Sequence, residues 1–108
     1  MLKQLYAQLQ TGAILLIAVA PAEDEVLFHQ ELLTVAATHP RFRYLPFVAA
    51  EGEQQGVDLA CSMLRPLIEK APKMIPMLCG TKGFVRPLRA YLAEAGYDRK
   101  EVKIETYN

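Results

Sequence analysis

The sequence predicts an α/β fold, in which a small, open and mainly parallel sheet of about four strands carries helices on both faces. Two observations predict this. Short apolar runs alternate regularly with longer segments of helical period, which are long enough to form the crossovers that parallel strands need. The run at 13–20, AILLIAVA, also lacks any polar alternation. Such a run is typical of a strand that is buried on both faces.

Length and composition indicate one domain, residues 1–108, with 52% hydrophobic and 22% charged residues. The 12 basic and 12 acidic residues balance and are scattered, so neither nucleic acid nor a membrane surface is an expected partner. The apolar run at 13–21 is too short to span a bilayer, and the N-terminus lacks the apolar core of a signal peptide. Two cysteines cannot build a disulfide framework or a four-thiolate cluster. We therefore expect a cytoplasmic location.

The first half of the chain is predicted to begin with a helix at 1–10, followed by the strand at 13–20. Residues 21–40 then carry apolar side chains at helical spacing. The acids at 23–25 lie in the first turn of this expected helix, where the helix dipole favours negative charge. Pro40 is expected to end it.

A second strand is predicted at 41–50, where aromatic and β-branched residues return. Pro46 has no N–H to donate to a neighbouring strand, which favours a position at the edge of the sheet. A polar loop at 51–56 and a helix at 57–70 are expected next. The apolar side chains that recur at a spacing of four and form the expected stripe of this helix are Leu59, Met63 and Leu67. Pro66 is expected to bend or split it.

The remaining elements are a short strand at 73–80, a helix at 83–95 and a last strand at 101–107, which alternates in polarity. Gly96 is a suitable stop for the helix. Pro76, near the start of the strand at 73–80, fits poorly with an interior position in a sheet.

Ligands of open α/β sheets bind beyond the carboxyl ends of the strands, which here are residues 19–22, 49–54 and 79–84. The segment Cys79-Gly80-Thr81-Lys82-Gly83 is the most suggestive of these. Its glycine allows a ligand to approach the backbone, and the helix that follows attracts anions. From the residues alone, two interpretations stay open. The segment is a ligand loop, or it is an ordinary strand-to-helix turn with a small buried cysteine.

Other patterns add little chemistry. The sequence contains no G-x-G-x-x-G motif and no Walker loop. The histidines His29 and His39 are solitary, so no metal site is predicted. Lys82 is suited to meet a phosphate, but a single exposed lysine is usually a surface residue.

Taken together, the segments resemble the nicotinamide-nucleotide-binding half of the ferredoxin–NADP reductase superfamily, which are flavin-dependent NAD(P)H oxidoreductases. Residues 14–32 are similar to the second strand of that family and its helix, and residues 40–49 to its Phe-x-Tyr-x-Pro strand. Residues 77–107 resemble the C-terminal signature, in which Cys-Gly precedes a helix, a glycine and a Glu-x-aromatic ending. The positions that match this signature are Cys79, Gly80, Gly96, Glu105 and Tyr107.

The resemblance implies a role for most of these residues. Cys79 and Glu105 would be the catalytic pair at the hydride-transfer centre, with Cys79 a contact residue and not a nucleophile. The residues placed beside the nicotinamide or flavin would be Gly80, Thr81, Lys82, Phe84 and Tyr107. Ala49 and Glu51 would face the adenosine ribose. Because an acid there accepts a ribose hydroxyl and repels a 2′-phosphate, NAD is slightly favoured over NADP.

The resemblance also implies a Rossmann-like fold that is truncated at the N-terminus. In this family the first strand lies in the middle of the sheet, and it would precede residue 1 together with the glycine-rich turn. Either the strands at 13–20 and 73–80 then pair directly, or a partner, such as a second copy of the chain, supplies the missing strand. The remaining alternative is that the chain is a truncated piece of a larger enzyme. The FAD would be held by a flavin domain outside this chain, which makes that domain or a redox partner protein the expected partner.

The leading hypothesis is therefore the NAD(P)-binding portion of a flavin-dependent reductase, with little or no activity as an isolated chain. The alternative is a non-catalytic α/β interaction or regulatory module that derives from such a domain. Residues that depart from the family pattern favour the alternative; they are Val19, Pro21, Ala49, Ala50 and Thr81. An unrelated receiver-like fold is disfavoured, because it would need a cluster of acids at the strand ends.

Overall fold

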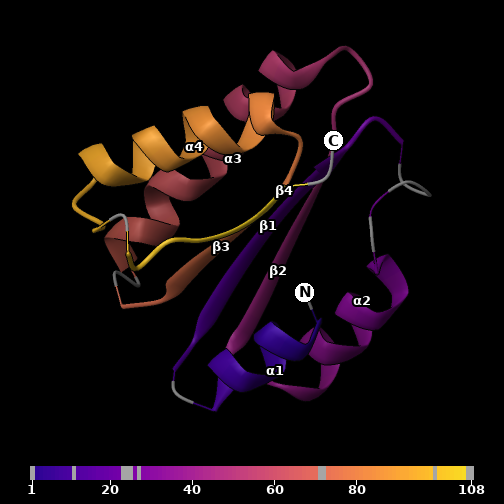
Figure 1. Ribbon diagram of the computed structural model, residues 1–108, viewed down its shortest axis with the longest axis vertical. Coiled ribbons are helices and arrows are strands. Elements are labelled where there is room, and N and C mark those ends of the chain that lie inside the picture. Colours follow the sequence, from indigo (N-terminus) through magenta and orange to yellow (C-terminus); the bar gives the residue numbers. More distant parts are fainter. Residues whose placement is uncertain are drawn as a thin grey trace.

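In the computed structural model, which describes residues 2–10, 12–22, 26, 28–70, 73–98 and 100–106, four parallel strands form a sheet with helices on both faces (Figure 1). The elements in chain order are α1 (Leu2–Leu9), β1 (Ile14–Ala20), α2 (His29–Thr38), β2 (Phe42–Val48), α3 (Glu53–Lys70), β3 (Ile75–Gly80), α4 (Lys82–Glu94) and β4 (Lys103–Thr106). The predicted fold class is confirmed.

The strand order is β2-β1-β3-β4, and every described pairing is parallel. β1 and β3 pair directly, in a register that runs from Ile14 opposite Ile75 to Ala18 opposite Cys79. The structure therefore shows the direct pairing that was one of the expected arrangements, and this pairing needs no second chain. A second copy of the chain as a partner stays a prediction.

The two faces of β1 explain its uninterrupted aliphatic sequence, because all seven of its residues are buried. Leu15, Ile17 and Val19 pack against α3 and α4, whereas the alternate residues pack against α1 and α2. Figure 1 shows the same division, with α1 and α2 on one face of the sheet and α3 and α4 on the other. Both faces of the sheet therefore need apolar side chains, as expected of a covered parallel strand.

Both strand prolines lie where no N–H is needed. Ile14 N–H donates to Arg41 O at 2.9 Å, so the odd-numbered residues of β2 turn their backbone groups to β1 and Pro46 faces the open edge. The edge position predicted from Pro46 is confirmed. Ile75 N–H donates to Ala13 O at 2.8 Å, so Pro76 faces the side of β4 instead. The pairing with β4 begins only at the next residue, Met77, so no donor is missed.

The prediction that a helix starts at 21 is wrong, because α2 begins at His29. Phe28 has a left-handed backbone with φ 58, a conformation that an α-helix cannot pass through. The acid in the first turn is Glu31, while the acids at 23–25 lie outside the described residues. The predicted end is confirmed, since His39 is extended before Pro40.

Helix α3 differs from the predictions in its start and in its buried stripe, and it does not split at Pro66. It begins at Glu53, so most of the expected loop at 51–56 is helical, and it continues through Pro66 without splitting. Its buried stripe is not the expected one, because Leu59 and Met63 are 43% and 48% exposed. The residues that face the core are Gly56, Val57, Ala60 and Leu64. Both sets have helical spacing. The lack of a side chain at Gly56 and the single methyl group of Ala60 allow the helix to lie close to the sheet.

Helix α4 ends as predicted. Gly96 has φ 109, and its N–H donates to Ala93 O at 3.2 Å while Tyr97 N–H donates to Leu92 O at 3.0 Å. These two bonds form a Schellman motif, which requires a residue such as glycine in the left-handed region. Within the described residues, no helix combines the length and the hydrophobicity that crossing a bilayer requires. The cytoplasmic location stays a prediction.

Candidate functional site

A small cavity of about 190 Å³ lies at the carboxyl end of the sheet. It is lined by Val19, Ala20, Pro21, Ala49, Gly52, Glu53 and Thr81. These residues lie at or just after the carboxyl ends of β1, β2 and β3, which are the three strand ends that the sequence singled out. The chain leaves β1 toward β2 and returns to β3 on the other side of β1, so the cavity lies at the topological switch point of the sheet. Open α/β sheets bind their ligands at this point.

The turn after β3 depends on Gly80. Its φ is 156, and a Cβ there would lie 2.7 Å from Val19 Cγ1 and 3.0 Å from Phe84 Cδ2. No other residue fits this combination of backbone and space. Phe84 is 0% exposed and packs beneath Gly80 in the core under α3 and α4. The structure therefore gives Phe84 a packing position and not a surface that a ligand could touch.

The N-terminus of α4 is occupied by a carboxylate from α3. The Thr81 hydroxyl donates to Glu53 Oε2, and a Cβ on Gly83 would lie 2.4 Å from Glu53 Oε1. Helix α4 has no acid in its own first turn, and Thr81, its N-cap residue, makes no side-chain bond to the helix backbone. Glu53 therefore supplies the negative charge that the dipole of α4 favours. The place where an incoming anion would be attracted already holds one.

Cys79 and Glu105 are brought together, and neither of them lines the cavity. They lie opposite each other in the register of β3 and β4, and Cys79 belongs to the core under α1 and α2. Of the residues that line the cavity, Val19 and Ala49 belong to the core on the other face, whereas Ala20 belongs to the same core as Cys79. Burial of Cys79, together with the negative charge of Glu105, raises the pKa of the thiol to about 12. Cys79 is thus a buried thiol that stays protonated near neutral pH, and its predicted contact with a nicotinamide stays a prediction.

The other predicted residues are distributed around the cavity. Ala49 is 6% exposed and lines it directly, while Glu51 is exposed and its backbone N–H donates to Gln55 Oε1 at 3.0 Å. Lys82 is exposed as the first residue of α4. Tyr107 lies outside the described residues. The structure thus gathers Ala49 and Thr81 at one cavity, with Glu51, Gly80 and Lys82 next to them in the chain.

Two features were missed from the sequence. The first is Glu53, which the sequence places in a polar loop. Only the knowledge that a helix begins at Glu53 would have suggested its contact with the start of α4. The second feature is a hydrogen bond of 2.8 Å between His29 Nδ1 and the Tyr44 hydroxyl, which joins the start of α2 to the edge strand β2. No local pattern connects residues this far apart in the sequence.

The cavity fits a nicotinamide nucleotide only in part. Its volume is below the range of roughly 300–1,000 Å³ that is typical of small-molecule sites, so it suits one ring or sugar and not a whole dinucleotide. Its walls are mainly apolar, which suits a ring. The Glu53 carboxylate opposes the binding of a phosphate at the N-terminus of α4.

Comparisons with known proteins support the fold. No protein-family model and no curated protein matches the sequence. Among solved structures, the fold is similar to "Ferredoxin-NADP+ reductase from Plasmodium falciparum", with a TM-score of 0.66 and 13% sequence identity. The similarity covers 91% of this chain and 54% of that chain, so this chain spans about half the length of that reductase. At this identity the similarity shows the fold alone, and the fold is the one that the sequence resemblance implied.

Proposed function

We propose that this chain is the nicotinamide-nucleotide-binding portion of a flavin-dependent NAD(P)H oxidoreductase. The observation that supports this best is the similarity in fold to a ferredoxin-NADP+ reductase over 91% of the chain. The cavity at the switch point of the sheet supports it as well, because it lies where such folds bind nucleotides.

In this proposal, the chain's own residues bind and orient the nucleotide. Ala49 and Glu51 lie toward the adenosine ribose, and the backbone at Gly80 and Thr81 lies toward the ring. Glu51 accepts a hydrogen bond from a ribose hydroxyl and disfavours a 2′-phosphate, so NAD is preferred over NADP. The nicotinamide supplies a hydride when it is bound, and the FAD that accepts this hydride belongs to a domain outside this chain. The isolated chain therefore has little or no reductase activity.

A second candidate is a non-catalytic α/β interaction or regulatory module with the same fold. One specific observation favours it: the Glu53 carboxylate occupies the N-terminus of α4 and opposes the binding of a phosphate there. The two candidates differ in a single measurable property, which is whether the carboxyl end of the sheet binds NADH.

Calorimetric titration with NADH separates the two candidates. The first predicts saturable binding by the wild-type chain. It also predicts that Glu53→Gln tightens this binding about threefold to tenfold, since one negative charge near the phosphates is removed. Glu69→Gln is the matched control, because Glu69 lies at the opposite end of the same helix; it should leave the affinity unchanged. No measurable binding by any of the three at about 5 mM NADH would instead support the module.

An activity assay tests the prediction of inactivity. The flavin-free chain is incubated with NADH and an artificial electron acceptor, and NADH oxidation is followed by its absorbance. We expect no oxidation above the rate of the mixture without protein. Turnover by the isolated chain would show that it needs no flavin domain.

A further inference from the structure

The two outer strands of the sheet differ in how their open sides are protected. Within the described residues, β2 and β4 are outermost, and each has one side on which no strand pairs. Pro46 lies in the middle of β2 and faces the open side, where it offers no N–H to an added strand. β4 (Lys103–Thr106) contains no proline. The edge at β4 is therefore the one that can still receive a strand.

The backbone groups of Ile104 are directed to this open side. Because Pro76 faces β4, Leu78 two residues later faces it as well. Leu78 lies opposite Ile104 in the parallel register. In a parallel pair such a residue bonds to the two neighbours of its partner, which here are Lys103 and Glu105. The N–H and C=O of Ile104 thus point away from β3, to the side where another strand would pair.

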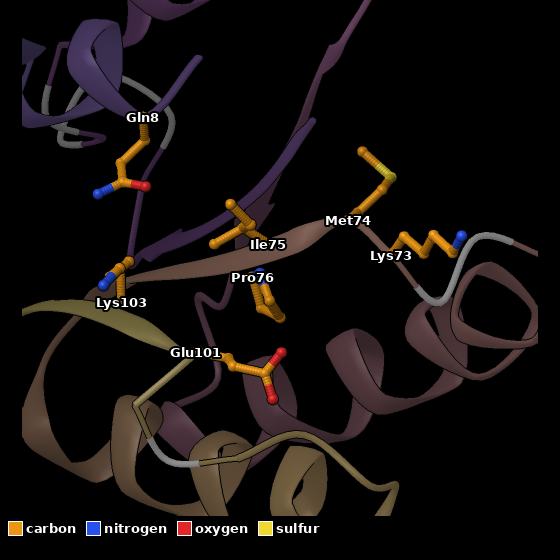
Figure 2. Close-up of a pocket in the computed structure, with 7 residues that line it drawn as sticks. All are labelled: Gln8, Lys73, Met74, Ile75, Pro76, Glu101 and Lys103. Atoms are coloured by element: carbon orange, nitrogen blue, oxygen red, sulfur yellow. The ribbon is translucent and has the colours of Figure 1, made fainter. Parts of the chain in front are cut away.

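The side chains of β4 divide between the two faces of the sheet. Ile104 takes the face of α3 and α4, where it is 38% exposed. Lys103 and Glu105 take the other face, and both are partly buried. Figure 2 shows Lys103 on the side of Gln8, which belongs to α1. The edge thus carries a basic and an acidic side chain on one face, with an apolar side chain between them on the other.

This arrangement is complementary to a second copy of itself. When two β4 strands pair antiparallel about a two-fold axis at Ile104, Lys103 of each copy lies directly opposite Glu105 of the other. Side chains in such pairs have Cβ atoms about 4.5–5.5 Å apart, so opposite charges stabilise the pairing and like charges oppose it. The two Ile104 residues form the hydrogen-bonded pair at the centre. One register therefore satisfies the outward backbone groups and both charges.

The charges also select the occupant of this edge. A lysine on an edge strand opposes pairing with an unrelated strand, because its charge is left without a partner. In a second copy of the chain, Glu105 supplies that partner in the register centred on Ile104. The strand β2 has no such arrangement, since its open side carries Pro46.

We propose that β4 is a dimerisation edge, at which two copies of this chain pair antiparallel and join their sheets into one. Lys103 and Glu105 form two symmetry-related pairs across the axis, and the two Ile104 residues lie at its centre. Because a strand of four residues buries little surface, the dimer is weak and forms in a concentration-dependent way.

Sedimentation equilibrium of the full chain between about 10 µM and 1 mM tests this, and the dissociation constant of the wild-type dimer should lie in that range. Lys103→Glu places like charges opposite each other in both pairs, and it should weaken the association at least about tenfold. Glu105→Lys should have the same effect. Combining the two substitutions restores opposite charges, and the double variant should recover the wild-type constant to within about threefold.

Lys100→Glu is the matched control, because it makes the same change in net charge at an exposed lysine outside β4. It should leave the association unchanged. A wild-type chain that stays monomeric over the whole range would overturn the proposal. So would a dimer that Lys103→Glu weakens no more than Lys100→Glu does, or a double variant that associates no better than the single ones.

Ile104→Pro tests the backbone part of the contact. It removes the outward N–H and no hydrogen bond to β3, so the chain should fold, as its circular dichroism will show, and remain monomeric. Ile104→Val keeps the N–H and the branched side chain, and this control should dimerise like the wild type. A folded Ile104→Pro that dimerises like the wild type would overturn the proposal. If Ile104→Pro does not fold, the charge exchange between Lys103 and Glu105 decides.

Discussion

Cys79 is kept protonated by its surroundings, and this determines its reactivity. It is 1% exposed, and burial together with Glu105 raises the pKa of the thiol to about 12. Cys61 is half-buried on α3, where burial and the charge of Asp58 also raise its pKa. We predict that iodoacetamide at pH 8 modifies Cys61 slowly and leaves Cys79 intact until the chain unfolds, as peptide mass spectrometry will show. Modification of Cys79 at the same rate as Cys61 would contradict its burial.

The raised pKa of Cys79 also predicts how stability depends on pH. Below pH 9.0 the thiol is protonated in the folded and unfolded chains alike, so its contribution to the free energy of unfolding is fully present. Between pH 9.0 and about 12 the unfolded chain releases this proton while the folded chain keeps it, and the free energy of unfolding falls. Urea unfolding between pH 8 and about 11 should show a shallower decline in Cys79→Ala than in the wild type. Identical declines would exclude the linkage.

At the scale of elements, α3 and α4 are joined through Glu53. Glu53→Gln removes the charge at the N-terminus of α4, and we expect it to lower the free energy of unfolding by about 0.5–1 kcal/mol. Glu69→Gln serves as the control, because an acid in the last turn of α3 opposes the dipole; its loss should be neutral or slightly stabilising. Urea unfolding of both variants checks this pair. If both variants lowered the free energy of unfolding equally, the contact between Glu53 and α4 would contribute nothing to stability.

The two glycines within helices should respond differently to alanine. A Cβ on Gly56 would lie 2.8 Å from Val19 Cγ2 and 3.2 Å from Ala49 Cβ, both in the packed core. Overpacking of roughly 1–3 kcal/mol then exceeds the gain of about 1 kcal/mol in helix propensity, and Gly56→Ala should destabilise by about 1 kcal/mol.

Gly83→Ala is the matched comparison. Its Cβ would meet only the flexible end of Glu53, so the propensity gain and the lost contact are of similar size. We expect a change within about 0.5 kcal/mol in thermal unfolding. If Gly56→Ala lowered the stability less than Gly83→Ala, the close packing of α3 against the sheet at Gly56 would be contradicted.

At the scale of the whole molecule, the sequence predicts a structural feature correctly where the burial of an element or the chemistry of a single residue type determines it. The aliphatic run of β1, the edge position of Pro46 and the stop at Gly96 each follow from local chemistry and are confirmed. The stripe of α3 could not be chosen in this way, because two sets of residues share the helical spacing and only tertiary packing selects one. The left-handed Phe28 likewise has no sequence signal.

The sequence likewise predicts only some parts of the candidate site. The strand ends that form the cavity follow from topology, and Ala49 and Thr81 lie beside it, while their role in binding a nucleotide stays a prediction. Cys79 is buried in the core under α1 and α2 and does not line the cavity, which no local pattern predicts. Glu53 was missed because its partner, Thr81, is 28 residues away. Contacts between the ends of different helices are set by the assembled fold.

The central claim is that the carboxyl end of the sheet binds a nicotinamide nucleotide, and NMR mapping of NADH binding tests it most directly. The account predicts saturable shifts of the amides of Ala49, Gly52, Thr81 and Lys82, with the amides near Lys103 at the opposite end of the sheet unchanged. The absence of shifts at about 5 mM NADH, or shifts confined to the amino end, would contradict it.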